Sequence, residues 1–254
     1  MKTVRVRDVV IGEGVPKVCV PIVEKKLEDV VLAAGNLKAS GADVAEWRID
    51  WFDDGYETDK VVEAARRIRE VLKEVPLLAT FRTAGEGGVK EINVQQYIDL
   101  YLALIHSGYV DLIDVELFFD EEAAKYLVAE AHKEGVCVIA SNHDFENTPE
   151  KAEMFRRVEK MIELGADIPK IAVMPRKMED VMVLLIATYE MSHNLADRPI
   201  ITMSMSKEGV ISRFSGEFFG SALTFASIGK ESAPGQIEAG NLKKMLTQIH
   251  EIIS

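Results

Sequence analysis

The sequence predicts an α/β fold and, within that class, a closed (β/α)8 TIM barrel. Short apolar segments alternate with segments of helical periodicity along the whole chain, which is typical of a parallel sheet. The apolar segments number about eight, which favours a closed barrel over an open sheet. The length of 254 residues suits one such barrel, and no linker or shift in composition divides it. We therefore expect residues 1–254 to form a single domain.

The predicted strands are short runs rich in Val, Leu and Ile, as expected for strands that are covered on both faces. They comprise residues 18–22, 44–50, 77–82, 112–117, 136–143, 168–174, 200–204 and 223–227. The predicted helices repeat their apolar residues at helical spacing, and several end at a glycine. They comprise residues 60–73, 94–107, 121–133, 150–164, 178–193 and 238–253. Residues 4–12 precede the first barrel strand, and we expect an antiparallel hairpin there that closes the N-terminal end of the barrel.

Composition limits the classes of partner. The chain carries 30 Lys and Arg against 42 Asp and Glu, a net charge of −12, which argues against nucleic acid or an anionic membrane as a partner. No segment has the length and apolar character of a membrane span or a signal peptide. Cys19 and Cys137 lie in strand-like runs and are expected to be buried free thiols. These features predict a cytoplasmic protein.

Lys170 occupies the middle of an apolar strand, which is an unusual place for a charged side chain. Because side chains alternate along a strand, Ile168, Lys170, Ala172 and Met174 share one face. Burial disfavours an ammonium group, and a neutral amine is a nucleophile toward carbonyl carbon, so Schiff-base chemistry is indicated. The alternative is a structural lysine that reaches solvent along its apolar stem or pairs with an acid.

Polar residues follow the predicted strands, where a barrel enzyme keeps its active site. Each has a structural alternative. Glu46 with Arg48, and Asp114 with Glu116, could be internal ion pairs, and Arg213 could lie on a helix surface. His143 could be a partly buried structural histidine, and residues 232–236 could be a simple turn. The sequence contains no His-rich cluster, dinucleotide-binding motif or Walker loop, so we expect no metal and no cofactor.

These segments together resemble one known family, the type I 3-dehydroquinate dehydratases. The resemblance spans nearly the whole chain, and many separate motifs occur in one order. They include Glu46-Trp47-Arg48, Thr80-Phe81-Arg82, Glu86-Gly87-Gly88, Ser141-Asn142-His143-Asp144-Phe145, Pro169-Lys170-Ile171-Ala172-Val173-Met174-Pro175, Thr202-Met203-Ser204-Met205, Ile211-Ser212-Arg213 and Ser232-Ala233-Pro234-Gly235-Gln236. The resemblance implies a cofactor-free lyase of the shikimate pathway, commonly a homodimer, that dehydrates 3-dehydroquinate to 3-dehydroshikimate.

The resemblance also implies a role for each site residue. Lys170 would form the imine, His143 would transfer the proton, and Glu86 would orient His143. The substrate-binding residues would be Glu46, Arg48, Arg82, Arg213, Ser232, Gln236, Met203, Met205 and Phe225. Thr83 stands where serine is common in the family, and none of the departures removes a group named here. The alternatives are a class I aldolase-like barrel that also forms an imine, and a catalytically silent barrel.

Overall fold

The wall of the fold is a curled parallel sheet. The computed structural model describes residues 3–230 and 232–254. The strands of the wall follow one another in space as they do in the chain, except that the last one pairs with the first. They are β3 (Lys17–Ile22), β4 (Val44–Arg48), β5 (Leu77–Thr80), β6 (Leu112–Glu116), β7 (Cys137–Asp144), β8 (Ile168–Val173), β9 (Ile201–Ser204) and β10 (Leu223–Ser227). A parallel bridge between Ile200 and Ser221 brings β9 and β10 together, so the predicted barrel is confirmed.

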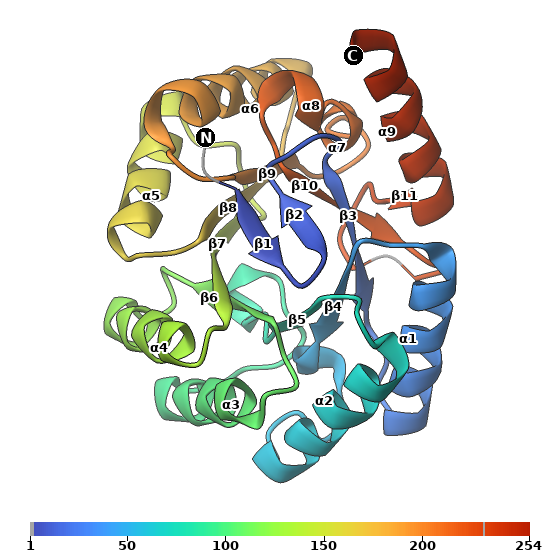
Figure 1. Ribbon diagram of the computed structural model, residues 1–254. Coiled ribbons are helices and arrows are strands. Elements are labelled where there is room, and N and C mark those ends of the chain that lie inside the picture. The colour runs from blue at the N-terminus through green and yellow to red at the C-terminus, as the bar shows by residue number, and fades with distance from the viewer. Residues whose placement is uncertain (1–2, 231) are drawn as a thin grey trace.

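Helices surround this wall on the outside (Figure 1). They are α1 (Leu27–Ser40), α2 (Thr58–Leu72), α3 (Val94–Ser107), α4 (Glu121–Lys133), α5 (Lys151–Glu163), α6 (Met178–Glu190), α7 (Ile211–Phe214), α8 (Gly216–Phe219) and α9 (Ala239–Ile253). The predictions for α3 and α4 match residue for residue. The predicted helix 178–193 is α-helical only as far as Glu190, and a π-helical turn, Met191–Leu195, follows it. A short strand, β11 (Ile237–Glu238), pairs with β10 and was not predicted.

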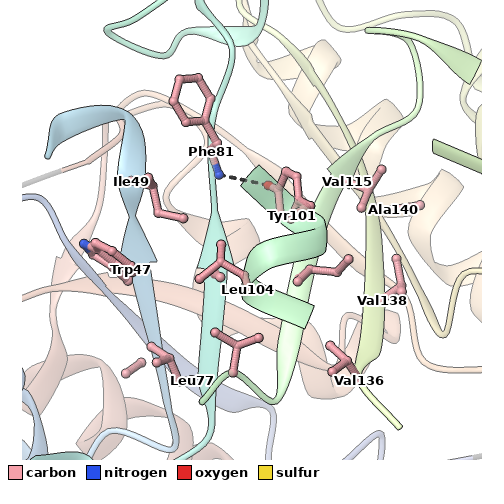
Figure 2. Close-up of a cluster of buried hydrophobic side chains, with 14 of the residues drawn as sticks. Trp47, Ile49, Leu77, Phe81, Tyr101, Leu104, Val115, Val136, Val138 and Ala140 are labelled. Carbon is pink, nitrogen blue, oxygen red and sulfur yellow. Dashed lines mark hydrogen bonds between the residues drawn. The ribbon is translucent and has the colours of Figure 1, made fainter. Parts of the chain in front are cut away.

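The packing of α3 on the wall shows how a helix and the strands share their buried polar groups. Figure 2 shows Tyr101 and Leu104 of this helix lying against the strands, with the Tyr101 hydroxyl directed at the chain near Phe81. That hydroxyl accepts a hydrogen bond from the Phe81 N–H at 2.9 Å and donates to the main-chain oxygen of Asp114 at 2.5 Å. Because the tyrosine joins the residue after β5 to the middle of β6, it fixes the backbone near Arg82 and at Asp114.

A second apolar cluster fills the inside of the barrel at its N-terminal end. It contains Val6 and Ile11 of the hairpin formed by β1 (Val4–Val6) and β2 (Val9–Ile11), together with Leu112 and Ile168 from the wall. The hairpin lies across the middle of the ring of strands (Figure 1). The predicted closing hairpin is therefore confirmed, and this end of the barrel is filled with apolar side chains.

Two sequence predictions need correction. The predicted strand 44–50 ends at Arg48, and residues Ile49–Trp51 form a 3-10 turn, so Asp50 lies beyond the strand. Cys19 is buried as predicted, but Cys137 is only partly buried because it is the first residue of β7, at the N-terminal end of the strand. No helix within the described residues is long and apolar enough to cross a membrane.

Candidate active site

A pocket opens at the C-terminal ends of the strands, opposite the hairpin. Every site residue predicted from the sequence lines it, although these residues come from widely separated parts of the chain. They are Glu46, Arg48, Arg82, Glu86, His143, Lys170, Met203, Met205, Arg213, Phe225, Ser232 and Gln236. Gly87, Phe145, Ala172 and Ala233 line it as well and were not predicted. The convergence that the sequence predicts is thus present in the fold.

Lys170 is the third residue of β8, and its side chain points into the barrel interior. The side chain is 3% exposed, and its Nζ atom donates to Asp114 Oδ2 at 2.8 Å. The ring of Phe225 lies on the ammonium group as well, with its centroid 4.4 Å from Nζ. A carboxylate and an aromatic face therefore both contact this nitrogen. Lys170 therefore does pair with an acid, as the structural alternative predicted. It does so inside the pocket where imine chemistry would take place.

Arg82 connects Asp114, the ion-pair partner of Lys170, to the buried carboxylate of Glu116. Its guanidinium contacts Asp114 Oδ1 and Glu116 Oε1, each at 2.8 Å. Asp114 Oδ1 also accepts a bond of 2.5 Å from the Ser141 hydroxyl. Asp114 and Glu116 do not pair with each other, because each forms an ion pair with Arg82. Thr83 donates from its hydroxyl to Glu116, so threonine supplies the group that a serine would give here.

Glu86 and His143 form a second pair in the pocket. Glu86 ends a 3-10 turn, Ala84–Glu86, and its Oε2 atom lies 2.9 Å from His143 Nδ1. The same carboxylate accepts from the His143 main-chain N–H at 2.9 Å and from the Asn142 amide at 3.0 Å. When Nδ1 donates to Glu86, Nε2 remains as the unprotonated nitrogen of the imidazole. This arrangement presents His143 as a base.

The glycines after Glu86 explain why the turn can form. Gly88 lies so close to the Arg82 main-chain oxygen that an added Cβ would overlap it, at 1.9 Å. Gly87 has φ +84°, and the Phe145 ring occupies the place of a side chain there. A residue with a side chain at either position would displace the turn and hence the carboxylate.

Burial shifts the proton affinities of this pair in opposite directions. Loss of water, and then the nearby Glu116 carboxylate, raise the pKa of Glu86 to about 8. Loss of water, together with the positive charges of Arg82 and Lys170, lowers the pKa of His143 well below its usual value. Both shifts disfavour charge on the isolated group, so the imidazole is held neutral at neutral pH. For Asp114, burial opposes ionisation, but Arg82 and Lys170 outweigh it and lower the pKa of this carboxyl.

Glu46 and Arg48 do not form the ion pair that the sequence allowed. Arg48 makes a two-pronged contact with Asp50, whose carboxylate lies 2.8 Å from the Arg48 Nε and Nη2 atoms. Glu46 instead accepts from the Thr80 hydroxyl at 2.9 Å. The 3-10 turn after β4 is the reason, because it folds the Asp50 side chain back toward Arg48.

Arg213 lies on α7 and is 1% exposed, so the helix-surface alternative is wrong. Its guanidinium donates to the main-chain oxygens of Phe225 at 3.3 Å and Pro234 at 2.8 Å. The Pro234 oxygen also accepts from the Ser206 N–H at 3.2 Å, which joins the two loops above the pocket. The cavity beneath them is only about 40 Å³. That is room for one or two water molecules, so a larger ligand requires these loops to move.

The residue that sequence reasoning undervalued is Asp114. Its position two residues before Glu116 on a strand suggested an internal ion pair, but its contact with Lys170 depends on strand register. In the sheet Asp114 pairs with Ile139, and Ile139 pairs with Ile168, so Lys170 lies two residues beyond the register partner of Asp114 and their contact cannot be read from either strand alone. In the part of the chain that the structure describes, no group of three or more His, Cys, Asp or Glu side chains could hold a metal ion.

The fold and the pocket define a class: a barrel enzyme with a buried lysine, a histidine–carboxylate pair and buried arginines. The family model for type I 3-dehydroquinase matches residues 18–253. The 3-dehydroquinate dehydratase of Salmonella typhimurium is 52% identical over 251 residues, which cover 99% of this chain and 100% of that protein. The chain therefore belongs to the type I 3-dehydroquinase family.

Solved structures of the family agree with this assignment. The type I 3-dehydroquinate dehydratase from Clostridium difficile, determined with covalently modified comenic acid, has a TM-score of 0.96 and 49% identity, covering 99% of each chain. The 3-dehydroquinate dehydratase from Geobacillus kaustophilus has a TM-score of 0.96 at 34% identity, covering 100% of this chain and 98% of that one. The assignment sets aside the aldolase-like barrel and the silent barrel.

Proposed function

We propose that this chain dehydrates 3-dehydroquinate to 3-dehydroshikimate through an imine at Lys170, the hydro-lyase reaction of the shikimate pathway. The observation that carries the proposal is the position of Lys170: a buried amine inside the barrel, in one pocket with a histidine–carboxylate pair. Neither a metal nor a cofactor is required, because the imine itself supplies the electron sink.

The first step joins Lys170 to the ketone of the substrate. The ammonium group first gives up a proton and the neutral amine attacks the carbonyl carbon. The same proton then returns, so that the hydroxyl group of the carbinolamine leaves as water and a protonated imine remains. The hydrogen on the neighbouring carbon is poorly acidic in the ketone. In the imine it becomes acidic, since the electron pair that it leaves behind can be delocalised onto nitrogen as an enamine.

His143 then moves that proton. Its Nε2 atom takes the hydrogen from carbon, and the imidazolium returns a proton to the hydroxyl group that leaves as water. Glu86 holds the ring through Nδ1 and offsets the charge that the imidazole acquires. Hydrolysis of the conjugated imine releases the enone product and the free lysine.

The remaining lining residues bind the polar edge of the ring. We assign the substrate carboxylate to Arg213, because a planar guanidinium can bind both carboxylate oxygens. On binding, the carboxylate would replace or join the Phe225 and Pro234 main-chain oxygens that Arg213 now contacts. The other contacts are assigned to Glu46, Arg48, Arg82, Ser232 and Gln236 on the polar side and to Met203, Met205 and Phe225 on the apolar side.

Two assays test this function. Formation of the conjugated enone from 3-dehydroquinate is followed by its ultraviolet absorbance, and a folded protein that gives no signal at saturating substrate would refute the activity. Borohydride reduction in the presence of substrate, followed by peptide mass mapping, should place an adduct on Lys170. Turnover without any such adduct would refute the imine mechanism while leaving the dehydratase activity intact.

We also propose a homodimer and a cytoplasmic location. Support for a dimer comes from α6, where Met178, Met182, Ile186 and Tyr189 are each about half exposed at helical spacing. Light scattering of the purified protein tests this, with Met182→Lys as the variant and Lys125→Met, on the exposed face of α4, as a control. A dimer that survives the Met182 substitution would remove α6 from the interface, and a monomeric parent protein would refute the dimer.

A further inference from the structure

Asp114 is the buried group in contact with the reacting nitrogen that the proposed mechanism leaves without a role. It is 0% exposed and does not line the pocket, so it approaches Lys170 from beneath. Its two oxygens are divided between two cations: Oδ2 lies 2.8 Å from Lys170 Nζ, and Oδ1 lies 2.8 Å from Arg82 Nη2. A carboxylate with this geometry acts on the lysine nitrogen without touching the substrate.

We propose that Asp114 is the counter-ion of the imine: it keeps the positive charge on the Lys170 nitrogen after the carbonyl has been captured. The inference rests on the proposed function, since it concerns the imine formed there. Arg82, Ser141 and the Phe225 ring hold the two partners in place, the last by lying 4.4 Å from Nζ.

The charge balance of the reaction explains why a fixed counter-ion suits it. An ammonium group and a carbonyl combine to give a protonated imine and one molecule of water, so the positive charge that the nitrogen carries at rest is back on it once the imine has formed. A carboxylate that pairs with the lysine at rest therefore pairs equally well with the imine. Without it, a buried imine would shed its proton, and a neutral imine is a weak electron acceptor.

The following step moves this charge but does not remove it. When the substrate's carbon-bound hydrogen passes to His143, the imine becomes a neutral enamine and the imidazole becomes imidazolium. The proton then leaves with the hydroxyl group as water, and the positive charge returns to the nitrogen of the conjugated imine. Glu86, 2.9 Å from His143 Nδ1, faces one end of this exchange and Asp114 faces the other. Arg82 lies between the two carboxylates, at 2.8 Å from Asp114 and 3.8 Å from Glu86.

The strand that carries Asp114 also provides a matched control. Glu116 lies two residues further along β6, is equally buried, and makes the same 2.8 Å contact with Arg82. Its carboxylate also accepts from the Thr83 main-chain N–H at 2.9 Å and from the Thr83 hydroxyl at 2.5 Å, and among the described residues it makes no hydrogen bond or ion pair with Lys170. Asp114→Asn and Glu116→Gln therefore both loosen Arg82, but only the first removes a charge from the imine nitrogen.

The experiment measures the rate at which borohydride fixes the substrate to Lys170, alongside turnover and binding of a ring ligand that carries a hydroxyl in place of the ketone. Borohydride reduces a protonated imine much faster than a neutral one. For Asp114→Asn we expect the rate of adduct formation and turnover to fall about 10- to 1,000-fold, the range expected for loss of an adjacent opposite charge. Binding of the hydroxyl ligand should change to the same extent in Asp114→Asn and Glu116→Gln, since both substitutions loosen Arg82 and neither carboxylate lines the pocket. Glu116→Gln should retain adduct formation within about tenfold of the parent protein.

The outcomes separate this inference from the proposed function. No adduct in the parent protein would remove the function itself. Adduct formation at the parental rate in Asp114→Asn, or an equal loss in Glu116→Gln, would overturn only the role of Asp114. Should Asp114→Asn not fold, Raman spectra of the parent protein with product decide the question. The C=N stretch should shift in heavy water if the imine is protonated, and a stretch that does not shift would overturn the proposal.

Discussion

The Glu86 carboxyl carries a cost in stability that grows with pH, and Glu86→Gln should remove it. Burial and Glu116 raise the pKa of Glu86 to about 8 in the folded protein. The unfolded chain releases that proton at about pH 4.3. Between these values the folded state binds one proton more than the unfolded state, so stability falls as pH rises, by about 1.4 kcal/mol per pH unit. Glutamine does not titrate, and this contribution to the slope should vanish.

The size of the effect is best measured between about pH 6.5 and pH 8. Burial lowers the pKa of His143 in the folded protein, but both proteins contain this histidine, so its own contribution cancels in the comparison. The stability difference between Glu86→Gln and the parent protein should increase by about 1–2 kcal/mol across the range. Glutamine offers one oxygen where the carboxylate accepts from Asn142 and His143, a loss of about 1–3 kcal/mol that does not depend on pH. That loss cancels when the two pH values are compared.

Denaturant unfolding of the two proteins at both pH values gives the measurement. Glu134→Gln, at an exposed position after α4, serves as the control and should show the same difference from the parent at both values. A stability difference for Glu86→Gln that does not change with pH would refute the reasoning. So would a parent protein that gains stability relative to the variant as pH rises. Turnover of Glu86→Gln should fall, because glutamine cannot become a carboxylate that offsets the charge acquired by His143.

Three further predictions concern turnover, binding and loop motion. His143→Ala should still give the borohydride adduct at Lys170 but lose roughly 10²–10⁴-fold in turnover, and near-normal turnover would remove His143 from the mechanism. Arg213→Ala should raise KM by roughly 10- to 100-fold, with Arg213→Lys intermediate, since lysine keeps the charge but not the fork; an unchanged KM and kcat would refute the carboxylate assignment. Residues 206–209 and 232–236 should be cut by protease more slowly when product is bound, and equal cutting rates would count against their closing over the ligand.

The fold was predictable because its strands and helices carry strong local signals. The helices at 94–107 and 121–133 were found to the residue from the helical spacing of their apolar residues, and in the structure an asparagine or aspartate side chain caps each of them. The helix α1 was not among those predicted: it contains Gly35 and Asn36, which weaken helical propensity, and its stability comes from packing on the wall. The hairpin followed from its alternating pattern.

The site was predictable as a set of residues but not as a set of contacts. Motif resemblance supplied the 12 predicted site residues, and the pocket contains them all. The ion pairs between acidic and basic side chains depend on strand register and on short turns, and neither can be read from the sequence. Thus Asp114 on β6 forms an ion pair with Lys170 on β8, with β7 between them. Asp50 forms an ion pair with Arg48 from a 3-10 turn. The roles that the resemblance assigns to these residues remain predictions until the variants are measured.

The hairpin at the N-terminal end of the barrel determines how substrate enters and how product leaves. Because Val6 and Ile11 fill that end, the interior is a blind well with one mouth. Substrate, product and the water consumed in hydrolysis all pass through the same opening, so a new substrate cannot arrive before the previous product has left. A ligand bound at the pocket opening would therefore block both substrate entry and product release. A ligand bound to the β1–β2 hairpin should leave turnover unchanged.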